Sequence, residues 1–206
     1  MWSLFWWWWV APLGAAAALL FAVRFYRQVL AASAGDARMQ QVAGYVREGA
    51  WAYLKRQYRT IALVFVGLVL LLVWQAFGLG QQHGLVPFAF LTGGVLSALA
   101  GLIGMNAATQ ASSRTAQAAK ESLNRGLQVA FRAGAVMGLT IVGLGLSHIT
   151  LWFWVLGWLL PRVSDGWAMS LDEITAVMLC FAIGASVTAL FARVGGGIFT
   201  KSADVG

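Results

Sequence analysis

Charged residues are scarce in this 206-residue sequence. They make up 10% of the chain, whereas apolar residues make up 60%. Soluble domains usually contain about 25% charged and about 45–50% apolar residues. So few charged side chains are not enough to cover a soluble surface, which excludes an ordinary soluble domain. The composition instead predicts an integral membrane protein.

Cysteine and histidine are also rare. The single cysteine, Cys180, lies inside an apolar run, so a disulfide framework is excluded. Two histidines that lie far apart in the sequence supply too few ligands for a zinc site. No serine or cysteine has a suitable base partner, which disfavours covalent hydrolysis by a nucleophilic side chain.

Long apolar runs are what the sequence has instead. A transmembrane helix needs about 20 predominantly apolar residues. The predicted spans cover residues 2–23, 60–77, 85–111, 133–160 and 174–192. Tryptophans open the first span, and no charged residue precedes it, which indicates a retained helix rather than a signal peptide. The predicted fold class is all-α, a polytopic bundle of about five transmembrane helices.

Polar segments separate these spans. Within residues 24–59, apolar side chains recur at three- and four-residue intervals from Met39 to Leu54. This spacing predicts an amphipathic helix that leads into the second span. Residues 112–132 are expected to form a second polar loop, and Pro161 is expected to end the fourth span.

The distribution of positive charge predicts the orientation in the membrane. Thirteen of the fourteen Lys and Arg residues fall on alternate polar segments, and only Arg162 lies on the other side. Positive loops stay in the cytoplasm. We therefore expect the amino terminus outside and the carboxyl terminus in the cytoplasm. Because the basic residues are spread over short loops, the net charge of +7 indicates topology rather than nucleic-acid binding.

Small residues recur every four positions in the third and fifth spans. Gly93, Ser97 and Gly101 form one such row, and Gly184, Thr188 and Ala192 form another. Small side chains allow helix backbones to approach closely in lipid. We expect these two helices to pack against each other.

The carboxyl-terminal segment holds the candidate site residues Arg193, Lys201 and Asp204. A cation suits a phosphate group, and a carboxylate suits a hard metal ion such as Mg²⁺. Residues 196–202, GGIFTKS, approach a phosphate-binding loop, but such a loop follows a strand rather than a membrane span, so we reject that reading. From spacing alone, a plain topology-setting role is slightly favoured for the three residues.

Four strings of the sequence resemble the membrane-bound, ion-pumping pyrophosphatases. They are RVGGGIFTKSADVG at 193–206, REGAWAYLKRQY at 47–58, SALAGLIGMNAATQASSRTAQAA at 97–119 and VAFRAGAVMGLTIVGLGL at 129–146. The strings occur in the family's order and cover most of the chain from about residue 36 onward.

The resemblance implies a pump that hydrolyses Mg²⁺-pyrophosphate at the cytoplasmic face and moves H⁺ or Na⁺ through sixteen helices per subunit, as a homodimer. It implies that Lys201 contacts pyrophosphate, that Asp204 helps to hold the Mg²⁺-pyrophosphate, and that Arg193 belongs to the ion-coupling region. A prokaryotic inner membrane is the expected location. An arginine within a span is a functional candidate on physical grounds as well.

The chain differs from that family in length. It has about five spans, which corresponds to the amino-terminal third of such a pump, and one carboxylate cannot hold several Mg²⁺ ions. We therefore expect the chain alone to be inactive and to need the missing carboxyl-terminal helices. The alternative is a non-catalytic five-helix membrane scaffold derived from the same family.

Overall fold

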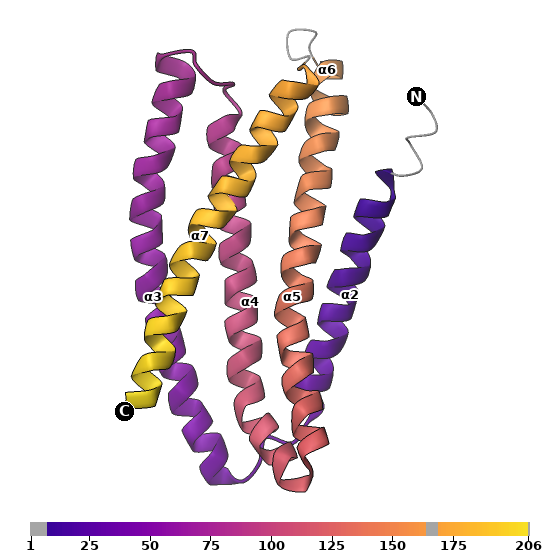
Figure 1. The fold of residues 1–206 in the computed structure, drawn as a ribbon, viewed down its shortest axis with the longest axis vertical. Helices are drawn as coiled ribbons and strands as arrows, with labels where there is room; N and C mark the ends of the chain where they lie inside the picture. The colour runs from indigo at the N-terminus through magenta and orange to yellow at the C-terminus, as the bar shows by residue number, and fades with distance from the viewer. Residues whose placement is uncertain (1–7, 164–168, 206) are drawn as a thin grey trace. The chain divides into compact units, whose positions relative to one another are not determined.

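All secondary-structure elements of the described residues are helices (Figure 1). It is a computed structural model that describes residues 8–163 and 169–205, without the side chains of residues 202–204. The elements are α2 (Val10–Ala31), α3 (Ala37–Val73), the π-helical segment η1 (Trp74–Gly78), α4 (Val86–Glu121), α5 (Leu123–Trp154), the π-helical segment η2 (Val155–Leu159), α6 (Leu160–Val163) and α7 (Leu171–Val205). The all-α fold class is confirmed. Residues 2–7 of the predicted first span lie outside the described residues.

Five helical stretches in the described part of the chain are long and apolar enough to cross a membrane. They are Val10–Ala31, Ala37–Gly78, Val86–Glu121, Leu123–Val163 and Leu171–Lys201. The predicted helix is confirmed, because α3 runs without a break from Ala37 into the second predicted span. Its predicted apolar face is buried at Ala50 and Leu54 but exposed at Val42 and Val46. The positions of the membrane boundaries on these helices stay predictions.

The predicted polar loop at residues 112–132 is wrong. Helix α4 continues to Glu121 and α5 begins at Leu123, so only Ser122 separates two long helices. Hydropathy marks where a helix can contact lipid, but it does not mark where the helix ends. Ala, Arg, Gln and Leu recur in this segment and are strong helix formers, and the helices therefore extend past their apolar parts.

Pro161 does not end the fourth membrane helix, contrary to expectation. The helix passes through η2 and continues as α6 to Val163. In η2 the turn is widened, and the N–H of Leu160 donates to the carbonyl of Val155, five residues earlier. A proline has no N–H to donate and crowds a regular α-helical turn. A π-helical turn directly before it is one of the local adjustments that helices use.

Two connections depend on glycine. Gly35, between α2 and α3, has φ of 86°, and Gly80, between η1 and α4, has φ of 63°. These left-handed values are costly for residues that carry a Cβ atom. Each glycine therefore allows the chain to reverse its direction within a few residues.

The chain divides into two compact units, and α3, α4 and α5 each contribute one part to either unit. The first comprises Met1–Arg56 and Ala100–Leu144. Its buried apolar cluster is Val29, Ala111 and Ala133, contributed by α2, α4 and α5. Polar contacts add to this packing. The amide of Asn106 donates to the hydroxyl of Tyr26 at 3.2 Å, and Arg47 donates to the side chain of Gln110 at 2.9 Å.

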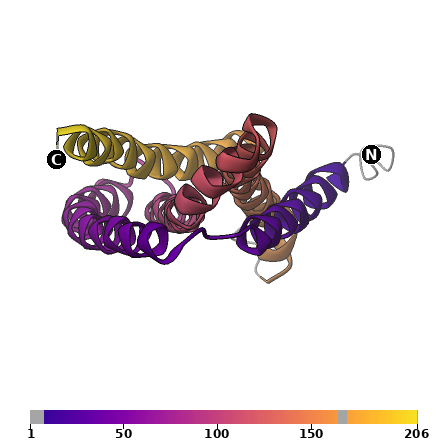
Figure 2. The same ribbon diagram turned by 90° about the horizontal axis from the view of Figure 1, so that it is seen from below.

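The second unit comprises Gln57–Leu99 and Gly145–Gly206. One buried cluster joins α4, η2 and α7 and consists of Val86, Ala89, Leu156, Ile174, Val177 and Phe181. Another joins α3 and α4 through Ile61, Phe65 and Phe90, with Val187 and Phe191 of α7 packed against it. Seen along the helices, α7 lies beside α3 and α4 (Figure 2). This unit carries all three candidate site residues.

Candidate functional site on helix α7

A capping box fixes the start of α7. The backbone N–H of Ser170 donates to the carboxylate of Glu173 at 2.7 Å, and the N–H of Glu173 donates back to Ser170 Oγ at 3.3 Å. The S-x-x-E pattern satisfies amide groups that have no partner within the helix. The carboxylates of Asp172 and Glu173 also lie in the first turn, where the helix dipole favours negative charge.

The middle of α7 packs closely against α4, as the rows of small residues predict. A Cβ atom added to Gly184 would collide with the backbone carbonyl of Phe90, and one added to Gly93 would collide with the carbonyl of Phe181. The hydroxyl of Thr188 donates to the carbonyl of Gly94 at 3.3 Å. The predicted packing of these two helices is therefore confirmed within the second unit. The part assigned to Gly101, which belongs to the other unit, stays a prediction.

Helix α3 contacts both of these neighbours through two adjacent polar side chains. The Gln57 amide donates to the backbone carbonyl of Phe191 on α7 at 2.7 Å. The Tyr58 hydroxyl donates to the carbonyl of Ala98 on α4 at 2.7 Å. Sequence reasoning missed both residues. The available signal is that Tyr58 follows Leu54 and precedes Ile61 at helical spacing, so a polar group stands on the buried face of α3.

The segment that holds the candidate residues continues α7 rather than forming a loop. Residues 193–205, including Gly195, Gly196 and Gly197, are helical. A phosphate-binding loop would instead join a strand to the start of a helix. The rejection of that motif for GGIFTKS is therefore confirmed.

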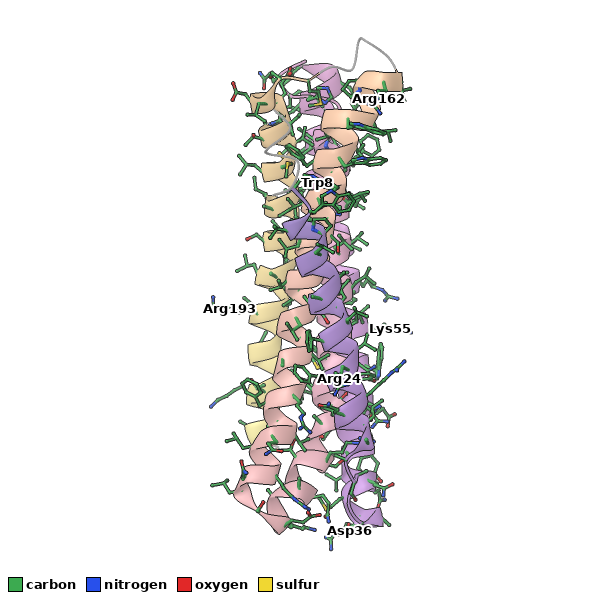
Figure 3. All side chains as sticks on the ribbon, turned by 90° about the vertical axis from the view of Figure 1, so that its right-hand side faces the viewer. Trp8, Arg24, Asp36, Lys55, Arg162 and Arg193 are labelled. Atoms are coloured by element: carbon green, nitrogen blue, oxygen red, sulfur yellow. The ribbon has the colours of Figure 1, made fainter. Side chains whose placement is uncertain are left out.

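The structure places Arg193 and Lys201 on α7 with exposed side chains. The Arg193 side chain projects outward from the helix (Figure 3). At about 100° per residue, Lys201 is turned by about 80° from Arg193, and the backbone position of Asp204 by about 20°. Arg193 and Asp204 thus share one side of α7, about 17 Å apart along the axis. Within the described residues neither Arg193 nor Lys201 has a hydrogen bond or an ion pair.

Metal binding needs more ligands than this segment offers. Among the described residues, no three His, Cys, Asp or Glu side chains lie together in a way that could hold a metal ion. Octahedral Mg²⁺ prefers carboxylate and phosphate oxygens together with water. The side chain of Asp204 lies outside the described ones, so its part in binding Mg²⁺ stays a prediction.

The fold and this segment define a class, a multi-pass membrane protein with cations and a carboxylate at the end of one long helix. Comparison with known families agrees. The family profile described as inorganic H⁺ pyrophosphatase matches residues 16–206. The chain belongs to the inorganic H⁺ pyrophosphatase family.

Several curated relatives match nearly the whole chain. A Bacteroides thetaiotaomicron protein, named as a candidate K⁺-stimulated pyrophosphate-energized sodium pump, is 50% identical over 203 residues, 98% of this chain and 27% of its own length. A Methanosarcina mazei protein named a K⁺-insensitive pyrophosphate-energized proton pump is 41% identical over 95% of this chain and 26% of its own length. A Moorella thermoacetica protein named K⁺-insensitive pyrophosphate-energized proton pump 2 is 44% identical over 95% of this chain and 26% of its own length.

These comparisons refine two expectations. The chain spans about a quarter of the length of these relatives, 26–27%, rather than the predicted third. The family match also begins at residue 16, inside the first span, although the four sequence strings begin only at residue 47. The family match therefore includes the greater part of α2.

Proposed function

We propose that this chain is the amino-terminal portion of a membrane pyrophosphatase that couples Mg²⁺-pyrophosphate hydrolysis to the movement of H⁺ or Na⁺. The family match that runs through the RVGGGIFTKSADVG segment to residue 206 carries this proposal. The relatives named as pumps include both proton and sodium pumps, so the transported ion stays open between the two. The complete subunit works as a homodimer in a prokaryotic inner membrane, with the end of α7 in the cytoplasm.

The candidate residues have distinct roles in this proposal. Lys201 contacts pyrophosphate, since a polyanion needs cations to offset its charge. Asp204 helps to hold Mg²⁺ bound to pyrophosphate, together with ligands from the remaining helices, and the metal offsets negative charge on the phosphate oxygens. Arg193 belongs to the ion-coupling path, because its exposed guanidinium extends from a membrane helix that has no acidic partner for it among the described residues.

A chimera tests the proposal. The chain replaces the matching segment of the Bacteroides thetaiotaomicron relative, and the product is reconstituted in liposomes. We expect Mg²⁺-dependent pyrophosphate hydrolysis and ion uptake by the chimera, and neither from the 206-residue chain alone. Loss of a hydrogen bond to a charged group costs about 1.5–3 kcal/mol, so Lys201→Ala should lower kcat/KM about 10- to 100-fold.

The other two site variants separate the roles. Asp204→Ala should raise the Mg²⁺ concentration needed for half-maximal activity. Arg193→Ala should reduce ion uptake at least as much as hydrolysis. Lys55→Ala is the matched control, because Lys55 is an exposed cation on α3 outside the site (Figure 3). Hydrolysis by the isolated chain would refute the need for further helices. An active chimera that is indifferent to both Lys201→Ala and Asp204→Ala would refute the site assignment.

A further inference from the structure

The hydrogen bond from Gln57 to α7 lies between the packed part of that helix and its more exposed carboxyl-terminal part. Its acceptor, the carbonyl of Phe191, lies two residues before Arg193. A backbone carbonyl has two lone pairs. It can therefore accept both the regular helical N–H of Gly195 and the amide of Gln57. The Phe191 carbonyl of α7 thus accepts a second hydrogen bond, which comes from α3.

Upstream of this point, α7 is held on several sides. Val187 and Phe191 pack against the cluster of Ile61, Phe65 and Phe90. Thr188, which is 1% exposed, donates to the Gly94 carbonyl at 3.3 Å. This stretch therefore belongs to the packed part of the second unit.

Downstream of this point, Gly195 is still buried and Phe199 is half-buried, but most of the described side chains of α7 are exposed. Three consecutive glycines follow, and each costs a helix about 1 kcal/mol relative to alanine. A Cβ atom at Gly196 or Gly197 would have no neighbour within 4 Å. Val194 and Ile198 are 58% and 63% exposed. The turns that carry Lys201 thus depend on the anchored turn before them for their direction.

We propose that Gln57 is a positioning residue that fixes the rotation and the last anchored turn of α7 and thereby sets where the Arg193–Lys201 segment points. Arg193 follows Phe191 by two residues, which is about 200° around the helix. Fixing the Phe191 carbonyl against α3 therefore turns Arg193 away from α3. The structural part of this proposal stands by itself. Its consequence for activity rests on the proposed function.

Tyr58 provides a matched control within the same turn of α3. Its hydroxyl makes a hydrogen bond of the same length, 2.7 Å, to a backbone carbonyl, but that carbonyl belongs to Ala98 on α4. Tyr58→Phe removes one donor and keeps the ring. Gln57→Met likewise removes the donor and keeps the length of the side chain. Each variant therefore removes one hydrogen-bond donor of α3, and the two lost bonds lead to different helices.

Hydrogen–deuterium exchange of the full 206-residue chain in lipid nanodiscs tests the anchor. The net contribution of one hydrogen bond is about 0.5–1.5 kcal/mol, so Gln57→Met should speed exchange of the amides from Ala192 to Gly197 about 2- to 10-fold. Tyr58→Phe should leave those amides unchanged and speed exchange near Ala98 instead. Gln57→Asn, which keeps an amide but is one carbon shorter, should behave as Gln57→Met.

Unchanged exchange of these α7 amides in both Gln57 variants would overturn the proposal, and so would an equal increase in Tyr58→Phe. If Gln57→Met lowers the yield of folded protein, the polar Gln57→Asn variant provides the same comparison.

A second arm measures activity in the chimera. Gln57→Met should lower the number of ions moved per pyrophosphate hydrolysed, whereas Tyr58→Phe should leave this ratio unchanged. A general loss of folded protein would lower both activities together and leave the ratio as it is. If the unmodified chimera hydrolyses no pyrophosphate, the proposed function fails, yet the exchange experiment still decides whether Gln57 anchors α7. If the chimera works and the ratio is unaffected in Gln57→Met, the consequence for coupling is wrong.

Discussion

One carboxylate, Asp36, fixes the start of the longest helix. Its Oδ1 accepts the backbone N–H of Met39 at 2.8 Å, which caps α3. Its Oδ2 lies 3.6 Å from Lys120 Nζ at the end of α4. The hydrogen bond from Met39 is the largest cause that holds the pKa of Asp36 below its ordinary value of 3.8, and Lys120 lowers it further. The charged form is therefore favoured in the folded protein.

This shift predicts acid sensitivity. Because the pKa of Asp36 is lower in the folded than in the unfolded chain, its carboxylate stabilises the fold at neutral pH. That contribution is lost as the pH falls through the folded pKa. Asp36→Asn should lower the Tm of the chain in detergent at about pH 7, and the difference from the unmodified chain should shrink as the pH falls through the folded pKa of Asp36. Lys120→Met should reproduce only the part of this Tm decrease that comes from the ion pair with Asp36. A Tm difference that is independent of pH would contradict this prediction.

The sequence suggests a role only for side chains whose own chemistry points to one. Lys201 and Asp204 stand out as candidates because a cation and a carboxylate lie together in a familiar string, and their roles stay predictions. Gln57 is not recognisable, because its role depends on which carbonyl lies opposite it in the folded chain. Its partner Phe191 is 134 residues away in the sequence. No local pattern reports a contact of this kind.

At the scale of elements, the sequence predicts helices better than it predicts their ends. Apolar runs identify the membrane-crossing parts because burial in lipid requires them. The polar extensions of α4 and α5 around Ser122 depend on helix propensity and on packing against neighbouring helices, which hydropathy does not report. Close packing of α4 on α7 could be predicted, because backbone contact requires small residues such as Gly184 and Gly93 at regular spacing.

A pair of glycine substitutions tests this packing. Gly184→Ala should destabilise the chain by about 1–3 kcal/mol, because the added methyl group would collide with the Phe90 backbone and the two helices would have to separate. Gly145→Ala is the matched control. Gly145 also lies within a helix, but a Cβ atom there meets nothing within 4 Å. Gly145→Ala should therefore leave the free energy of unfolding unchanged or raise it by up to about 1 kcal/mol. Thermal unfolding in detergent measures both, and equal Tm values for the two variants would show that the contact is not tight.

At the scale of the whole molecule, the chain displays large apolar side chains along every long helix. Examples on different helices are Leu20, Leu63, Ile141 and Ile198, each 49% exposed or more. Such surfaces suit contact with lipid or with further helices, in keeping with a multi-pass membrane protein that spans about a quarter of its relatives' length.

The orientation of the chain is a separate prediction. Gln82 precedes α4 and Gln117 lies near its end. The 36 residues of α4 extend about 54 Å, more than the ~30 Å hydrocarbon core, so the two positions should lie on opposite sides of the membrane. The bias of thirteen of the fourteen basic residues then assigns Gln82 to the outside and Gln117 to the cytoplasm.

Cysteine labelling in intact cells measures this orientation. In a Cys180→Ser background, Gln82→Cys should react with a membrane-impermeant maleimide from outside. Gln117→Cys should react only after the membrane is permeabilised, which also serves as the control that its thiol is reactive. The reverse pattern would show that the chain is inserted the other way round, with the Lys201 end of α7 outside. That result would also remove the proposed pyrophosphate site from the cytoplasm, where the bias of basic residues predicts it. Labelling of both positions from outside would instead show that α4 does not cross the membrane.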